Sequence, residues 1–205
     1  MDYGFNDLKD PNAYNPERSK QLLAEDGWKD TDGDGILDKD GKPLTFNFIV
    51  YNSRAELPLY AEAVQADLKK VGIDMKIKTV DYNLIDKMGQ DGDYDMLISN
   101  IVTANTGDPI WFLANYWHTN NNGSNPQNGS GYSNPQVDQL LDAAETEFDP
   151  AKRRDYAMQI QQLLMNDGAA LFLGYPKTNI VTGSYLKGAV MYPSDYYWIT
   201  NKITK

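Results

Sequence analysis

The sequence contains no cysteine among its 205 residues. This absence excludes disulfide bonds, thiolate metal sites and a cysteine nucleophile, and it leaves the redox compartment open. Histidine occurs once, at His118, and the sequence has neither a Gly-x-Ser-x-Gly motif nor a glycine-rich phosphate-binding loop. Enzymes of the hydrolase and transferase classes need a nucleophile, a base and a charge-stabilising group at one point. We therefore expect no catalytic residues, and we expect that the protein is not an enzyme.

Clusters of basic residues and long apolar runs are also lacking. The chain has 19 Lys and Arg against 29 Asp and Glu, which gives a formal net charge of -10 and argues against nucleic acid as a partner. No apolar run approaches the ~18 residues of a membrane span, and no charged-then-apolar leader opens the chain. With 41% hydrophobic residues, the chain can bury the core of one large or two small domains.

Helical and strand patterns alternate along the first half of the chain, which predicts the fold class. Segment 73–80 alternates apolar and polar residues, as an edge strand does, whereas 96–102 is nearly all apolar, as a strand covered on both faces is. The alternation predicts an α/β fold with a mainly parallel sheet flanked by helices. In chain order the predicted elements are helix 16–26, strand 44–51, helix 56–71, strand 73–80, helix 82–88 and strand 96–102.

Four helices are predicted to begin at an Asn-Pro or Asp-Pro pair. The first residue of such a pair can accept hydrogen bonds from the free amides of the helix, and proline fits the start of a helix. The pairs are Asn15-Pro16, Asp108-Pro109, Asn134-Pro135 and Asp149-Pro150. The polar loop 119–134 is long enough to be functional or mobile. After the last helix we expect strands at 169–175 and 178–182 and an extended or irregular tail at 191–199.

Polar and aromatic residues gather near the ends of the predicted strands. In open α/β sheets, ligands bind just beyond the carboxyl ends of the strands, and stacking with hydrogen bonding suits a small polar molecule. The alternatives are a plain strand-to-helix turn at 103–109 and, for His118, a surface histidine beside a core tryptophan. The candidate ligand-binding residues are Tyr51, Asn52, Thr103, Asn105, Thr106, Trp111, Trp117, His118 and Tyr132.

Carboxylates alternate along the acidic segment 30–41, around a glycine at the sharp turn. This pattern matches part of a calcium loop, although Gly41 stands where a bidentate glutamate is expected. The alternative is an acidic, solvated connection between a helix and a strand. No cofactor is required, and any calcium is expected to be structural. The candidate calcium ligands are Asp30, Asp32, Asp34, the Ile36 carbonyl and Asp38.

Several segments resemble, in the same order, the C-terminal lobe of the family 5 extracellular solute-binding proteins that serve peptide and nickel ABC importers. The resemblance spans nearly the whole chain, and the acidic segment 30–41 is similar to one in Gram-positive members. The segments are Tyr14–Glu17, Leu22–Trp28, Leu68–Ile73, Tyr94-Asp95, Gly107–Pro109, Gly131–Pro135, Val137–Leu141 and Arg153–Leu164.

The resemblance implies a receptor of two lobes that closes on its ligand and delivers it to a membrane permease. It implies that residues 1–205 form a single C-terminal lobe, without the signal sequence, the lipidated cysteine and the N-terminal lobe. It also implies an extracellular location, as a lipoprotein on a Gram-positive cell or in a periplasm. The alternative function is a calcium-stabilised extracellular interaction module built on segment 30–38.

The resemblance leaves the ligand open between a peptide and a nickel complex. Peptide-binding members often carry an Asp where this chain has Asn105 and a Trp where it has Val102. Nickel-type members place a histidine after the same Asp-Pro helix, and His118 lies in that neighbourhood. Segments 174–177 and 179–181 are also similar to nickel-type members. The leading residues for one wall of the ligand cleft are Asn105, Trp111, Trp117, His118 and Tyr51.

Overall fold

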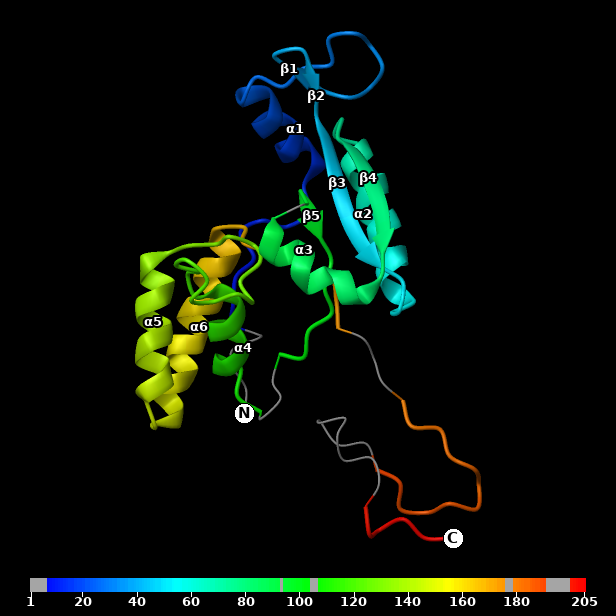
Figure 1. Cartoon of the computed structure of the whole chain (residues 1–205), viewed down its shortest axis with the longest axis vertical. Helices are drawn as coiled ribbons and strands as arrows, with labels where there is room; N and C mark the ends of the chain where they lie inside the picture. The colour runs from blue at the N-terminus through cyan, green and yellow to red at the C-terminus, as the bar shows by residue number, and fades with distance from the viewer. Residues whose placement is uncertain (1–6, 93, 104–106, 176–178, 191–199) are drawn as a thin grey trace. The chain divides into compact units, whose positions relative to one another are not determined.

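The structure is a computed structural model, and contacts within it divide the chain into two units, Met1–Leu171 and Phe172–Lys205. Figure 1 draws the residues whose structure is not described as a thin grey trace. The prediction of a single lobe over residues 1–205 stays a prediction. The described residues are 7–92, 94–103, 107–175, 179–190 and 200–205.

The first unit contains a three-stranded parallel sheet whose middle strand is β3 (Thr45–Tyr51). Strand β4 (Asp74–Val80) pairs with β3 along its whole length, and β5 (Met96–Leu97) pairs with the other side of β3. Parallel strands need long crossover connections, which are usually helices. The alternating pattern of the sequence therefore predicted this fold class correctly.

Strand β5 is much shorter than the strand predicted over 96–102, and it lies at an edge of the described sheet. Ile98 still donates its amide to the Ile49 carbonyl at 3.1 Å. The next pairing is lost because the Asn100 amide donates to the side-chain hydroxyl of Tyr51 at 3.0 Å and not to a strand. Val102 is 49% exposed. The prediction of a long strand covered on both faces was wrong for this reason.

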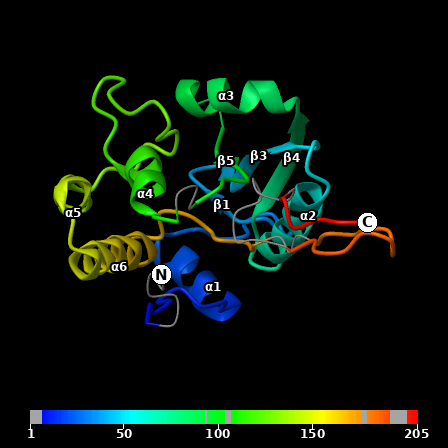
Figure 2. The same cartoon turned by 90° about the horizontal axis from the view of Figure 1, so that it is seen from below.

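Strand β4 forms the opposite edge of the sheet, as its alternating pattern predicted. Met75 is buried, whereas Lys76 and Lys78 are exposed. Helix α2 (Glu56–Lys69) packs on β3 and β4, and Gln65 donates to the Met75 carbonyl at 2.6 Å. Figure 2 shows η1 (Tyr82–Leu84) and α3 (Ile85–Asp91) on the other face of the sheet.

A small apolar cluster joins the N-terminal helix α1 (Pro16–Glu25) to the sheet. It contains Leu44, Val71 and Ile73, with Trp28 and Leu37 packed against them. Between α1 and β3 the acidic segment closes with a hairpin of β1 (Asp38–Lys39) and β2 (Lys42–Pro43). Its turn residues Asp40 and Gly41 both have positive φ, as tight hairpin turns require.

Three helices pack together after β5: α4 (Ile110–Trp117), α5 (Pro135–Thr146) and α6 (Pro150–Asn166). The predicted helix starts are confirmed, because the side chains of Asn15, Asn134 and Asp149 accept hydrogen bonds from the first amides of α1, α5 and α6. Asp108 likewise accepts from the Ile110 amide at 2.9 Å. The buried core of the three helices contains Ile110, Leu113, Trp117, Val137, Leu141, Ala144, Ala157, Ile160 and Leu164.

The loop 119–134 is held in place by asparagine side chains. Asn128 is 3% exposed, and its amide nitrogen donates to the carbonyls of His118 and Tyr132 at 2.9 Å each. The same loop meets α3 where Gly129 approaches the backbone of Gly89, so that a Cβ at Gly129 would lie 3.1 Å from the Gly89 Cα. These contacts join the loop to the end of α4 and to α3.

Segment 169–175 forms no strand, contrary to its apolar pattern, and the described residues 179–182 form none either. A strand needs a neighbour to take up its backbone hydrogen bonds, and none lies beside these residues in the described part of the chain. Within the described residues of Phe172–Lys205, one antiparallel bridge joins Lys187 and Thr204. The tail prediction for 191–199 lies outside the described residues.

In the described ranges, no helix combines the length and the apolar character that crossing a bilayer requires.

Candidate functional site

The carboxyl ends of the three parallel strands meet at one edge of the sheet, which we call the carboxyl edge. It is made by Tyr51, the last residue of β3, with Asn52 after it, by Asp81 and Tyr82 after β4, and by the segment 98–103 after β5. Ligands of open α/β sheets bind at such an edge. The fold therefore has a carboxyl edge of the kind at which the sequence predicted a ligand site.

Tyr51 is 2% exposed, and its side chain packs beneath the surface of this edge. Its hydroxyl accepts from the Asn100 amide, and the Asn100 side chain donates to Glu56 Oε1 at 3.3 Å. Its ring meets the ring of Tyr82 edge-on, with 5.1 Å between centroids. Burial raises the pKa of the Tyr51 hydroxyl above its ordinary value. Tyr51 therefore holds the ends of β3 and β5 together.

Tyr82 is an exposed aromatic residue of the carboxyl edge that the sequence analysis did not select. It lies two residues beyond β4, and it covers Tyr51 while its own ring stays largely exposed. The signal that could have found it is its position just after a strand. In the sequence, Tyr82 instead opens the helical pattern 82–88.

Trp117 and Tyr132 lie together among the three helices rather than at the carboxyl edge. Their rings meet edge-on at 5.8 Å, and Trp117 belongs to the buried core. The Tyr132 hydroxyl donates to Asp167 Oδ2 at 2.6 Å. Burial and the neighbouring Asp167 carboxylate raise the pKa of Tyr132 to about 12. The polar tip of Tyr132 thus has a partner at the end of α6.

The ring of His118 faces two carboxylates of α5. Nε2 lies 3.2 Å from Asp142 Oδ1 and Nδ1 lies 3.6 Å from Asp138 Oδ1. Burial lowers the pKa of His118, but the Thr119 carbonyl and the two carboxylates outweigh it and raise the pKa above the ordinary 6.5. Because each nitrogen faces a different carboxylate, the three groups do not converge on one point.

We expect the free energy of unfolding to fall as the pH rises above about 6.5, by less than about 1 kcal/mol because the ion pairs are partly exposed. The raised pKa means that the charged ring stabilises the folded state at low pH, and this stabilisation is lost as the ring deprotonates. His118 is the chain's one histidine. Urea unfolding between pH 5.5 and 8.5 should therefore show a fall in the free energy of unfolding that His118→Gln lacks. If this free energy changed with pH in the same way in both proteins, the prediction would be refuted.

The remaining predicted ligand residues differ in what they offer. Asn52 is exposed after β3, and Thr103 is half-buried at the end of the segment that follows β5. Trp111 stands on the first turn of α4 and is 46% exposed. Asn105 and Thr106 lie outside the described residues. Asn52 and Trp111 are thus the predicted residues whose side chains the structure leaves exposed, and whether they bind a ligand stays a prediction.

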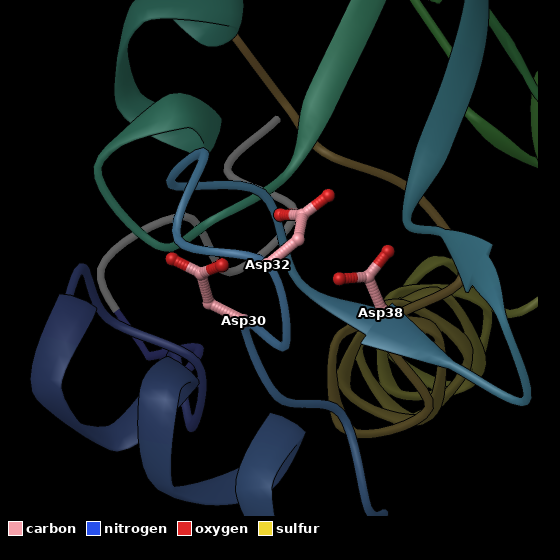
Figure 3. Close-up of side chains that lie close together, drawn as sticks. All are labelled: Asp30, Asp32 and Asp38. Carbon is pink, nitrogen blue, oxygen red and sulfur yellow. The ribbon is translucent and has the colours of Figure 1, made fainter.

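Three of the predicted calcium ligands lie close together. Carboxylate oxygens of Asp30, Asp32 and Asp38 lie within 4.8 Å of one another (Figure 3). The side chain of Asp34 is not part of this group, and it accepts from the Ile36 amide at 2.7 Å. Asp30 also accepts from two backbone amides, those of Gly33 at 2.7 Å and Gly35 at 3.1 Å. The structure therefore brings together part of the predicted ligand set.

Comparison with known proteins gives a family match. Residues 1–124 match the model of the bacterial extracellular solute-binding proteins, family 5 Middle. The oligopeptide-binding protein AppA of Bacillus subtilis (strain 168) is 31% identical over 187 residues, which is 88% of this chain and 33% of AppA. The nickel-binding protein NikA of Staphylococcus aureus is 26% identical over 206 residues, covering 98% of this chain and 39% of NikA.

A solved structure agrees with the sequence match. The structure of AppA from Bacillus subtilis in complex with a nonapeptide aligns with a TM-score of 0.80 and 29% identity, over 96% of this chain and 39% of that one. The chain thus spans about a third of the length of the curated relatives it matches. These relatives are binding proteins and not enzymes, which confirms the expectation from the missing catalytic motifs.

Proposed function

The chain belongs to the bacterial extracellular solute-binding proteins of family 5, and on this premise we propose that it is the C-terminal lobe of the substrate-binding component of an ABC importer. In this role it forms one wall of a cleft that captures a ligand outside the cell and delivers it to the membrane permease. The observation that carries the proposal is the carboxyl edge of the sheet, where Asn52 and Tyr82 are exposed. Trp111, exposed on α4, is the aromatic residue that we assign to the same wall.

A second, N-terminal lobe completes the cleft in this proposal. Two observations support it: the relatives are about three times as long as this chain, and its last part exposes apolar side chains. Segments 169–175 and 178–182 have the composition of strands but no neighbouring strand in the described residues. The exposed apolar side chains of this part of the chain are Leu171, Phe172, Tyr175, Val181 and Tyr185. A sheet of the second lobe would pair with these residues and cover them.

The ligand of the complete protein is proposed to be a peptide or a nickel complex, as in the two named relatives. The contacts of His118 favour the peptide. A histidine that coordinates a metal needs a free ring nitrogen, whereas both nitrogens of His118 face carboxylates of α5. A nickel complex remains the second candidate, and it would reach the wall with its own chelating groups.

Calorimetry on the complete binding protein tests the proposal with a pool of nonapeptides and with Ni(II)–histidine. We expect Trp111→Ala to weaken ligand binding by about tenfold or more, because a large exposed ring gives stacking area at little entropic cost. The matched control is Trp28→Ala, which removes the same side chain from the small cluster beneath α1. Equal binding by the Trp111 variant would remove this residue from the wall, and binding of neither probe by the unaltered protein would defeat the proposed function.

The family description places these proteins outside the cell. A lipid anchor on a Gram-positive cell and a free form in a periplasm are the two forms that this proposal includes. The chain contains no cysteine, so a lipidated cysteine would belong to another part of the complete protein.

We also propose that Asp30, Asp32 and Asp38 hold a structural calcium ion. Calcium at about 100 times its dissociation constant should raise the free energy of unfolding by about 2.7 kcal/mol. Thermal melts during calcium titration should show a saturable rise that Asp30→Asn abolishes, with Asp34→Asn as the control because Asp34 lies outside the group. If calcium did not raise the melting temperature, segment 30–41 would be a connection between a helix and a strand without a bound ion.

The relatives give no support to the alternative function, a calcium-stabilised interaction module.

A further inference from the structure

Arg153, on α6, contacts two other segments of the chain. Its Nε and Nη2 donate to Asp108 Oδ2 at 3.1 and 2.6 Å. Its Nη1 donates to the carbonyls of Ala144 and Glu147, at the end of α5. One guanidinium group on α6 therefore joins Asp108, two residues before α4, to the end of α5.

The Arg153–Asp108 pair is shielded enough to fix geometry. The two side chains are 22% and 29% exposed, so solvent screens the pair less than it screens an ion pair on the open surface. Two guanidinium nitrogens on one carboxylate oxygen also restrict the relative orientation of the groups more than a lysine would.

Asp108 transmits this restraint to α4. Its Oδ2 takes the two bonds from Arg153, while its Oδ1 accepts from the amide of Ile110, the first residue of α4. Ile110 is buried in the core of the three helices, and the next residue, Trp111, is 46% exposed. The position of the Trp111 backbone at the start of α4 is therefore tied, through Asp108, to Arg153.

We propose that Arg153 is a positioning residue of the ligand wall. It holds the first turn of α4 through Asp108 and so presents Trp111 in its binding orientation before the ligand arrives. This inference rests on the proposed function, because it takes Trp111 as part of the wall. A preorganised side chain loses less freedom on binding, so loss of Arg153 weakens binding without any lost contact to the ligand.

The test compares Arg153→Met with Arg154→Met in the complete binding protein. Both variants remove one positive charge from adjacent positions of α6, but Arg154 pairs with Asp7 in the N-terminal segment. We expect Arg153→Met to weaken binding of the nonapeptide pool, or of Ni(II)–histidine if that is the probe the unaltered protein binds, by about tenfold. Arg154→Met should change it by less than about twofold at the same temperature.

Two further measurements separate positioning from general stability. Hydrogen exchange without ligand should speed up at residues 110–113 in Arg153→Met but not in Arg154→Met, and Arg153→Lys should lie between Arg153→Met and the unaltered protein. Combining Arg153→Met with Asp108→Asn should weaken binding no further than the stronger single change, because both act through one pair.

Unchanged exchange at residues 110–113, or equal loss of affinity in Arg153→Met and Arg154→Met, overturns the positioning role and leaves the proposed function intact. Failure of the unaltered protein to bind either probe overturns the proposed function and, with it, the role of Arg153.

Discussion

Leu141→Ala is expected to lower the free energy of unfolding by about 3–5 kcal/mol. Leu141 lies on α5 with none of its surface exposed, among the residues that join α4, α5 and α6. The substitution removes buried methyl groups and leaves a cavity that the surrounding helices cannot fill. Urea unfolding of the complete chain would measure the loss, and thermal melts should show a fall on the order of 10 °C.

The adjacent Leu140 provides the control for this prediction. It lies on the same helix but is only partly buried, at the margin of the same core. Leu140→Ala removes the same atoms and changes helix propensity equally, so we expect no more than about half of the loss seen for Leu141→Ala. Equal losses would mean that the three helices do not pack as described.

Gly72→Ala is expected to destabilise the chain by about 2–5 kcal/mol, as the sum of two costs. Gly72 lies three residues beyond the end of α2 with φ at +83°, where an alanine costs about 1–2 kcal/mol. A Cβ there would also lie 2.6 Å from Leu37 Cγ, and forcing such a contact costs about 1–3 kcal/mol. Leu37 cannot simply move away, because its amide donates to the Gly72 carbonyl at 2.8 Å.

Gly33 allows the two costs to be separated. Its φ is also +83°, but a Cβ at Gly33 would meet nothing within 4 Å. Gly33→Ala should therefore show the conformational cost alone, about 1–2 kcal/mol. If chemical denaturation gave equal losses for the two variants, the close approach of Leu37 to Gly72 would not exist in solution.

The parts of the fold that sequence predicted well depend on neighbours close along the chain. Asn15, Asn134 and Asp149 cap helices through bonds to amides two or three residues away, so the local pattern carried the information. The alternation of Met75 with Lys76 and Lys78 likewise identified an edge strand from seven residues.

The partners of several polar side chains lie far away along the chain, so the sequence could not show whether these side chains are free to bind a ligand. Tyr51 meets Asn100, Tyr132 meets Asp167 and His118 meets Asp142, and these partners are separated by 49, 35 and 24 residues. A residue with a polar tip reads the same in sequence whether a ligand or a distant protein group takes its hydrogen bond. The exposure of Trp111 and Asn52 was similarly visible only in the fold.

Apolar runs also misled, because a strand is defined by its neighbour. Segment 96–102 pairs with β3 only at its start, and segment 169–175 has no partner strand in the described residues. Both segments have the composition of a strand, but the first forms only a short run of strand-to-strand hydrogen bonds and the second forms none in the described residues. Composition alone predicts that a segment can pair, but not whether a partner is present.

The two exposed lysines of β4 affect how readily copies of the molecule associate through this edge of the sheet at high concentration. If the β4 strand of a second copy docked in register against β4, it would set Lys76 and Lys78 beside the same residues of its neighbour. Repulsion between these rows of like charge opposes growth of a continuous sheet from molecule to molecule, so the open rim resists fibril formation.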